Sequence, residues 1–186
     1  MRIIRGTHRG RKIIAPANLP VRPTTDLAKE SMFNILDNNF YFEDIQVLDL
    51  FAGTGNISYE FASRECQLVM AVEQNPRCAK FISETAAKLS LDKLKVIKGP
   101  VEGFLKHTAL QFDIIFADPP YDMEGKAGIA ELVFGRSLLK DDGWLVIEHS
   151  KSDEFRRFPQ FFDQRRYGKV NFSFFREEKS RSQGPA

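Results

Sequence analysis

The chain has 186 residues, of which 42% are hydrophobic and 28% are charged, and it contains seventeen phenylalanines. A chain this apolar can bury enough surface to offset the entropy lost on ordering, which excludes disorder over most of its length and predicts one globular domain. Its apolar runs are much shorter than the roughly 20 residues that a membrane-spanning helix needs, so we expect a cytoplasmic protein without a membrane partner. The two cysteines, Cys66 and Cys78, lack the spacing of metal ligands. We therefore expect buried free thiols and no metal site.

The net charge of +2 is unevenly distributed along the chain. Residues 1–25 contain six basic and no acidic side chains, residues 26–148 contain twelve basic and twenty acidic ones, and nine basic and five acidic ones follow from Lys151 onward. Two basic ends therefore flank an acidic middle. This asymmetry is expected of a protein whose ends contact a polyanion, and a solvated surface of mixed charge is the alternative.

Residues 1–25 are predicted to form a basic arm and linker. Two short strands, 2–5 and 12–15, flank a turn rich in glycine and arginine, which is the pattern of a small β-hairpin. Residues 26–178 are expected to form the main domain. The last segment, 179–186, is too polar to pack and is expected to be disordered.

A helix is predicted to begin at Asp26. Thr24 or Thr25 can cap it, and the helix dipole favours the acidic side chain in its first turn. Its apolar residues recur at a spacing that covers one helix face. These residues are Leu27, Met32, Phe33, Ile35, Leu36 and Phe40.

From residue 46 onward, short apolar strands alternate with helices. Continuous apolar runs are typical of strands that helices bury on both faces, so the sequence predicts an α/β fold with a mostly parallel, doubly wound sheet. After Pro159, two runs separated by Gly168 and Lys169 predict a final antiparallel hairpin. The expected strands are 47–51, 68–73, 94–98, 112–118, 144–148, 161–167 and 170–175, and the expected helices are 58–63, 76–89, 101–107 and 126–139.

The segment 48–57 has the pattern of a strand, a glycine turn and the start of a helix. Gly53 and Gly55 allow the backbone to approach a ligand closely. The third glycine of the dinucleotide motif G-x-G-x-x-G is missing, because Ser58 occupies its place, and this disfavours a dinucleotide. Taken alone, the two glycines are also compatible with a simple tight turn.

Three acids are predicted to surround this turn. Glu73 closes the second strand twenty-four residues after Asp49, where a carboxylate can accept both hydroxyls of an adenosine ribose. Asp49, Glu73 and Asp118 would all end strands around one cleft. Negative walls repel a pyrophosphate and attract a sulfonium cation, so the pattern predicts a nucleoside site that suits a positively charged ligand.

The strand 112–117 runs directly into Asp118-Pro119-Pro120-Tyr121. Two consecutive prolines stiffen this turn. The Asp118 carboxylate and the Pro119 carbonyl can then each accept one N–H of a nucleobase amine, which directs the nitrogen lone pair toward a methyl donor. Tyr121 can stack on the base. The alternative is a structural turn that ends a strand and exposes a tyrosine.

In this order and spacing, the motifs resemble those of the Rossmann-like amino methyltransferases, which end the first, second and fourth strands. The amino-terminal segments narrow the resemblance to the bacterial 16S ribosomal RNA guanine-N2 methyltransferases (RsmD-like). The resemblance covers almost the whole chain, from Arg2 to Phe175. It is carried by 2–6, 9–11, 22–26 and Glu30, together with 49–55, Glu73 and 118–121.

The resemblance implies a seven-stranded Rossmann-like sheet with a C-terminal hairpin, in an enzyme that we expect to be a monomer. It implies S-adenosylmethionine as the methyl donor, S-adenosylhomocysteine as the product, and a guanine of 16S rRNA or of the 30S subunit as the acceptor. Catalysis would involve Asp118, Pro119 and Tyr121. Cofactor binding would involve Asp49, Phe51, Ala52, Gly53, Thr54, Gly55, Glu73, Gln74, Val101 and Asp118. RNA binding would involve Arg5, Arg9, Arg11, Lys12, Arg22 and Thr24.

The chain departs from the family pattern at Gly99-Pro100-Val101. Related enzymes usually place a polar residue followed by Ala or Val at this point to meet the adenine. Adenine recognition in this chain would then rest on the Val101 amide and on apolar contact.

Two other functions stay open on the sequence. A DNA adenine-N6 methyltransferase shares the amine chemistry, but only about 45 residues precede the first cofactor strand, which leaves little room for sequence-specific DNA recognition. A non-catalytic RNA-binding assembly factor would share the fold, but it would have no use for so demanding a loop as 118–121.

Overall fold

The computed structural model describes most of the chain. The predictions for Arg22, for Thr24 and for the tail 179–186 lie outside the described residues. Within the described part, none of the helices is both long enough and apolar enough to span a membrane. The described residues are 1–17, 19, 25–123, 125–151 and 155–177.

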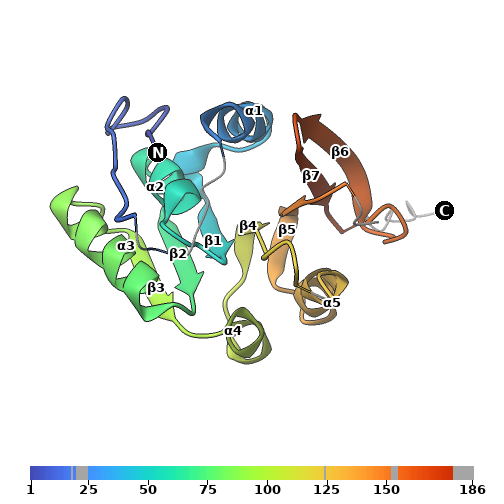
Figure 1. Ribbon diagram of the computed structural model, residues 1–186. Coiled ribbons are helices and arrows are strands. Elements are labelled where there is room, and N and C mark those ends of the chain that lie inside the picture. The colour runs from blue at the N-terminus through green and yellow to red at the C-terminus, as the bar shows by residue number, and fades with distance from the viewer. Residues whose placement is uncertain (18, 20–24, 124, 152–154, 178–186) are drawn as a thin grey trace.

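A seven-stranded sheet forms the core of the fold, in the order β3-β2-β1-β4-β5-β7-β6 (Figure 1). Strands β1 to β5 pair in parallel, and β7 runs antiparallel to both β5 and β6. The predicted α/β fold with a C-terminal antiparallel hairpin is therefore confirmed. The strands are β1 (Gln46–Leu50), β2 (Leu68–Glu73), β3 (Leu94–Lys98), β4 (Phe112–Ala117), β5 (Leu139–His149), β6 (Phe161–Tyr167) and β7 (Val170–Phe175).

Helices cover both faces of this sheet (Figure 1). Helices α1, α2 and α3 pack on one face, and α4 and α5 pack on the other. Successive strand residues alternate between the two cores, so that Ile114 belongs to the first and Ile115 to the second. Cys66 and Cys78 are buried and free, as expected. The helices are α1 (Asp26–Asp37), α2 (Asn56–Ser63), α3 (Pro76–Lys88), α4 (Val101–His107) and α5 (Ala127–Gly135), with a 3-10 turn η1 (Phe42–Asp44) that was not predicted.

Helix α1 begins as predicted but buries a different face near its start. The side chain of Thr25 accepts a hydrogen bond from the backbone N–H of Ala28 (3.3 Å) and so caps the helix. Leu27 was expected in the apolar stripe, yet 71% of it is exposed. Ala28 and the charged residue Lys29 are buried instead. The apolar stripe was wrong at this point because Lys29 joins a buried ion network, which takes the place of an apolar contact.

The amino-terminal arm is less regular than predicted. The two expected strands are reduced to one antiparallel bridge between Arg2 and Lys12. The backbone N–H groups of Ile4 and Arg5, which could have paired across the hairpin, bond to the carboxylate of Glu60 in α2 (2.8 and 3.0 Å). The arm therefore lies against a helix and makes only part of the expected hairpin.

The boundary between α5 and β5 was also predicted wrongly. The helix ends at Gly135 and the strand begins at Leu139, five residues before the expected start at Trp144. Ser137 adopts a φ of 50°, which a helix cannot accommodate. Leu139 then pairs with Phe112 in the parallel ladder, so burial in the sheet outweighs helical continuity.

Candidate active site

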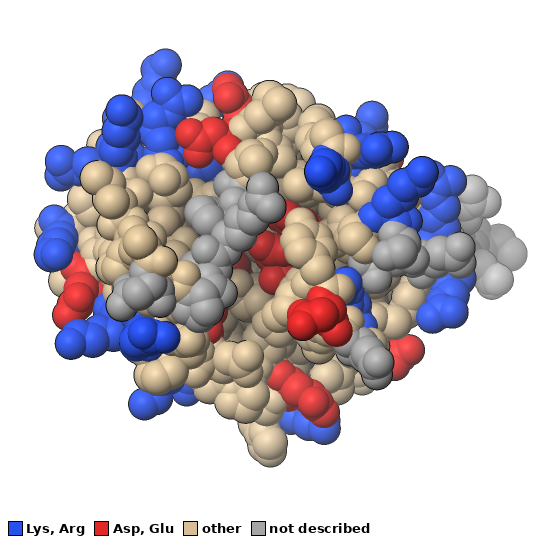
Figure 2. Space-filling model, in the orientation of Figure 1, with Lys and Arg blue, Asp and Glu red and all other residues tan. Residues whose placement is uncertain are grey.

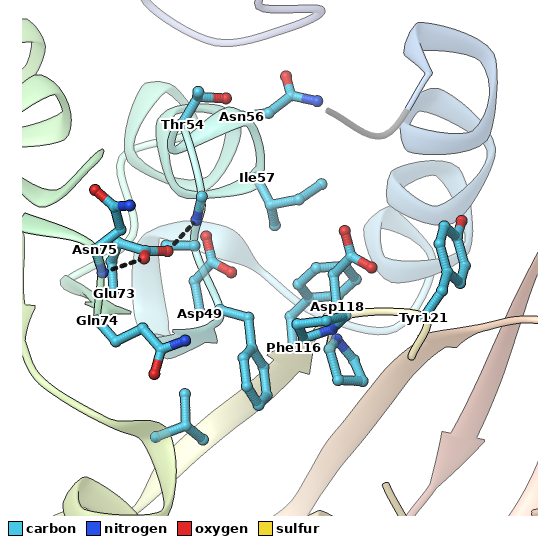
Figure 3. A pocket seen from close by; sticks show the side chains of 16 residues that line it. Asp49, Thr54, Asn56, Ile57, Glu73, Gln74, Asn75, Phe116, Asp118 and Tyr121 are labelled. Carbon is cyan, nitrogen blue, oxygen red and sulfur yellow. Dashed lines mark hydrogen bonds between the residues drawn. The ribbon is translucent and has the colours of Figure 1, made fainter. Parts of the chain in front are cut away.

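A cavity of about 380 Å³ opens at the edge of the sheet where β1, β2 and β4 end (Figure 3). The strand order reverses between β1 and β4, and ligands of open α/β sheets bind at such a switch point. The predicted site residues that line it are Asp49, Phe51, Ala52, Gly53, Thr54, Glu73, Gln74, Val101, Asp118, Pro119 and Tyr121. The lining residues that were not predicted are Asn56, Ile57, Asn75, Phe116 and Pro120.

The turn after β1 brings backbone to the cavity in a strained conformation. Phe51, Gly53 and Gly55 have positive φ values of 61°, 57° and 81°. A non-glycine residue seldom adopts such a value, so the conformation of Phe51 at the cavity wall is a local constraint. A Cβ atom at Gly55 would lie 2.8 Å from the ring of Tyr59. Gly55 is therefore needed for the packing of α2 and does not itself line the cavity.

Glu73 ties two of the loops together. Its carboxylate accepts the backbone N–H of Gly53 (2.7 Å) on one oxygen and that of Asn75 (2.6 Å) on the other. A carboxylate offers about four lone-pair directions, so both oxygens keep capacity to accept a further donor. Glu73 thus fixes the glycine turn and still presents acceptors suited to two neighbouring hydroxyls.

Asp49 is only 1% exposed at the base of the cavity. Ser58 donates a hydrogen bond from its hydroxyl to the Asp49 carboxyl. The pKa of Asp49 is raised to about 7, mainly by burial and in part by the nearby charge of Glu73, while the hydrogen bonds from Ser58 lower it. Ser58, which stands where a dinucleotide motif has its third glycine, therefore has a role of its own beside this acid.

Asp118 meets the same cavity from the end of β4. Its backbone N–H reaches the carbonyl of Leu50 at the end of β1 (3.4 Å), and its carboxyl points into the space that Asp49 faces (Figure 3). Burial raises the pKa of Asp118 well above its usual value; the carboxylates of Glu148 and Asp49 raise it further, and Lys126 lowers it. Acids crowded in this way favour a positively charged ligand.

Tyr121 lies at the rim of the cavity, across from Asp118, with 60% of its surface exposed (Figure 3). An exposed aromatic face beside a carboxylate can stack on an unpaired base. Lys126, which is only 5% exposed, donates from Nζ to the backbone carbonyl of Tyr121 (3.0 Å). Sequence reasoning missed this contact, because no local pattern distinguishes a buried lysine from a solvated one.

The predicted RNA-binding residues of the arm lie on the surface. Arg5, Arg9, Arg11 and Lys12 are all exposed, and Arg5 makes an ion pair with Asp37 (2.8 Å). Figure 2 shows basic side chains around a central hollow in which acidic atoms are visible. The structure thus keeps these cations apart from the acidic cavity.

A buried ion network anchors the arm beside the cavity. The Lys29 ammonium is fully buried and lies 3.5 Å from the carboxylate of Glu60. It donates to the carbonyl of Arg2 in the arm (2.7 Å) and to the side chain of Asn56 at the cavity wall (2.9 Å). Burial lowers the pKa of Lys29, and Glu60 opposes that shift. Sequence reasoning missed both members, because their partners lie far away along the chain.

Comparisons with known proteins place the chain in a family. The family model described as "Conserved hypothetical protein 95" matches residues 1–176. The chain is 33% identical to ribosomal RNA small subunit methyltransferase D of Escherichia coli (strain K12) over 148 residues, which are 80% of this chain and 71% of that protein. It is 32% identical to the protein of the same name from Haemophilus influenzae over 155 residues, which are 81% and 79% of the two chains.

The fold is also found among solved structures. That of a hypothetical protein from Thermus thermophilus superimposes with a TM-score of 0.82 and 27% sequence identity. The match covers 94% of this chain and 98% of that one, so the fold is shared over nearly the whole length of both.

Proposed function

The chain belongs to the conserved hypothetical protein 95 family, and from that premise we propose that it transfers a methyl group from S-adenosylmethionine to the N2 amine of a guanine in 16S ribosomal RNA. The observation that carries the proposal is the placement of 118–121 at the mouth of a buried acidic cavity. Relatives named ribosomal RNA small subunit methyltransferase D support small-subunit RNA, free or in a 30S particle, as the substrate.

The cavity suits S-adenosylmethionine, which supplies a methyl group on a positively charged sulfur. Burial raises the pKa of both Asp49 and Asp118, so a cation in the cavity would stabilise their ionised forms. Glu73 keeps acceptor capacity for the two ribose hydroxyls. Val101 and Phe51 offer apolar contact on the side where the adenine would lie.

The chain's own residues then orient the acceptor. We assign to the Asp118 carboxylate and the Pro119 carbonyl the two N–H groups of the guanine amine, which frees the nitrogen lone pair for an in-line displacement. Tyr121 stacks on the base, a contact of roughly 1–3 kcal/mol. Holding the reacting atoms in line lowers the activation barrier by up to about 7–11 kcal/mol. The amine loses one proton during transfer, and the raised pKa of Asp118 suits it as the acceptor.

We assign RNA binding and catalysis to two parts of the chain. Residues 1–25 hold RNA phosphates through the exposed arginines of the arm, and 26–178 bind the donor and the target base. We also propose that a monomer is the active form.

The experiment compares methyl transfer and RNA binding in matched variants. Purified protein is incubated with labelled S-adenosylmethionine and with either 30S particles from cells lacking this protein or duplex DNA. Asp118→Ala should abolish transfer and leave RNA binding nearly intact, whereas Asp122→Ala, a change at an exposed neighbour, should leave both unchanged. Label on adenine would favour the DNA-type enzyme. RNA binding by the wild-type protein without any consumption of S-adenosylmethionine would favour an assembly factor.

A further inference from the structure

The hairpin β6–β7 and the segment before it carry a second concentration of positive charge. Among the described residues 155–177, six basic side chains are exposed and only Asp163 and Glu177 are acidic. Six basic and two acidic side chains give this segment a net charge of +4, against +6 for residues 1–25, and the proposed function assigns it no role. The six basic residues are Arg156, Arg157, Arg165, Arg166, Lys169 and Arg176.

The sheet topology puts the turn of this hairpin at the same edge as the cavity. Asn171 of β7 pairs with His149, which ends β5, and with Arg166 of β6. Since β5 runs parallel to β4, His149 and Asp118 follow neighbouring strands at one edge of the sheet. In the order β4-β5-β7-β6, three strand spacings, or about 15 Å, separate β6, which carries Arg165 and Arg166, from β4, which leads into Asp118. The residues Arg165, Arg166 and Lys169, here called the hairpin cations, therefore flank the loop 118–121, which we call the catalytic loop.

The hairpin lies on the opposite side of the cavity from the arm. Figure 1 shows the arm beside α2 and the hairpin β6–β7 beyond β5, with the ends of β1 and β4 between them. Figure 2 shows basic side chains on both sides of the hollow and acidic atoms within it. A polyanion cannot follow the acidic cavity itself, so its backbone must pass over the two basic sides.

The hairpin cations have donors to offer. Arg166 donates Nε to the carbonyl of Gly168 (3.0 Å), and Arg165 pairs through Nε with Asp163 (2.9 Å). A guanidinium has five N–H donors in a rigid fork, so in each arginine the Nη groups are available for the bidentate contacts that phosphates favour. Within the described part of the chain, the contacts of Arg165 and Arg166 use Nε and leave their outer donors unused.

We propose that the hairpin cations are a second RNA-phosphate site, which holds the strand on the side of the target guanine away from the arm. The inference rests on the proposed function and adds the course that the RNA strand takes over the protein surface. The strand crosses the cavity between two basic surfaces, and the target base leaves the stack to enter between Asp118 and Tyr121. The separation of about 15 Å corresponds to about four nucleotides at a rise of 3.4 Å.

The test measures RNA affinity of the full chain as a function of salt. In the hairpin variant, Arg165→Gln, Arg166→Gln and Lys169→Gln are combined; these side chains are exposed, so the fold is retained. Filter binding to naked 16S rRNA should show the slope of log Kobs against log salt reduced by about two, with affinity lowered at least about tenfold at moderate salt. Affinity for S-adenosylhomocysteine and the melting temperature should not change.

Two further variants separate this proposal from the proposed function. The control variant, Lys88→Gln with Lys95→Gln, removes exposed cations beside the opposite edge strand β3 and should leave binding unchanged. The arm variant combines Arg9→Gln, Arg11→Gln and Lys12→Gln. A hairpin variant with wild-type affinity and salt slope would overturn the second site, even where the arm variant is impaired and methylation persists.

The nature of the partner is tested by the same proteins. A loss of binding to 30S particles without any loss of binding to naked 16S rRNA would put a ribosomal protein on the hairpin and overturn the RNA site. Wild-type protein that neither binds 16S rRNA nor methylates 30S particles would instead contradict the proposed function.

Discussion

Single residues around the catalytic loop act through charge as well as position. Lys126 supports the loop at the carbonyl of Tyr121 and lowers the pKa of Asp118, while Glu148 raises it. In the proposed reaction Asp118 must be ionised, because its carboxylate accepts one amine N–H and then the proton that the amine loses. The Lys126 ammonium therefore holds the backbone of the catalytic loop in place and also makes ionisation of Asp118 easier.

Replacing this lysine should affect the reaction more than donor binding. We expect Lys126→Met to lower kcat by up to about a hundredfold, since small misplacements of reacting groups have effects of that size. Without the ammonium the pKa of Asp118 rises, so the acid limb of the pH–kcat profile should move to higher pH. Lys126→Arg keeps the charge and should recover part of the activity. An unchanged kcat and an unmoved acid limb for Lys126→Met would contradict this role.

Asp49 predicts a pH dependence of donor binding. Burial raises its pKa to about 7, so at lower pH the carboxyl is protonated and a bound cation must displace that proton. The affinity for S-adenosylmethionine should therefore increase between about pH 6 and pH 8, and that for the uncharged thioether of S-adenosylhomocysteine should increase less. Isothermal titration calorimetry measures both. Asp49→Asn should reduce the difference, and identical pH profiles for the two ligands in the wild-type protein would refute this account.

At the scale of elements, the arm and α2 behave as one packed unit. All residues of α2 from Asn56 to Ser63 are buried, although several are polar. The arm covers them: the N–H of Thr7 bonds to the Ser63 carbonyl (2.8 Å), and Ser63 Oγ donates to the carbonyl of Arg5 (2.7 Å). The arm that carries the exposed arginines is thus fixed to the helix that follows the glycine turn.

Two glycines of the arm give a matched test of this packing. Both Gly6 and Gly10 have a positive φ, 83° and 81°, but a Cβ at Gly6 would lie 1.8 Å from the Ser63 carbonyl oxygen, whereas one at Gly10 meets nothing within 4 Å. Gly10→Ala should cost about 1–2 kcal/mol of unfolding free energy from the φ strain alone. Gly6→Ala should cost more, about 3–5 kcal/mol, because the backbones must also separate. Urea unfolding measures both, and equal losses would show that the arm is not packed on α2.

Sequence patterns predicted the elements whose own apolar residues determine their structure. They failed for elements whose structure depends on contacts with residues far away along the chain. The parallel strands were predictable because an apolar run such as Phe112–Ala117 is buried on both faces whatever its neighbours. The arm strands were not, since the N–H groups of Ile4 and Arg5 bond to Glu60, more than fifty residues away. The carboxylates at strand ends were found by their positions. Lys29, by contrast, was missed because no local pattern marks a buried ion pair.

At the scale of the whole molecule, charge is sorted by position. The acids Asp49, Glu73 and Asp118 line the cavity at the edge of the sheet, and basic side chains lie on both sides of the hollow (Figure 2). A cationic methyl donor can then bind in the acidic cavity while an anionic RNA binds to the basic surfaces beside it, so that each meets protein charge of the opposite sign. This sorting was visible in the sequence as basic ends around an acidic middle, but its spatial arrangement depends on the sheet order.

The sorting predicts different salt responses for the two substrates. If Arg5, Arg9, Arg11 and Lys12 of the arm and the three hairpin cations each take one phosphate, the slope of log Kobs against log salt for 16S rRNA should be about −5. Affinity for S-adenosylhomocysteine should change little over the same range, because its site is buried and poorly screened. Parallel binding titrations with the two ligands test this prediction. A slope of log Kobs against log salt near zero for RNA would show that phosphate contacts do not hold the RNA.

The central claim is that the loop 118–121 presents a guanine amine to a methyl donor held in the acidic cavity. The most direct measurement is nucleoside mass spectrometry of 16S rRNA after 30S particles from cells lacking the protein are incubated with S-adenosylmethionine and the purified chain. The account predicts N2-methylguanosine with the wild-type protein and none with Asp118→Ala. N6-methyladenosine in its place, or N2-methylguanosine formed equally well by Asp118→Ala, would contradict it.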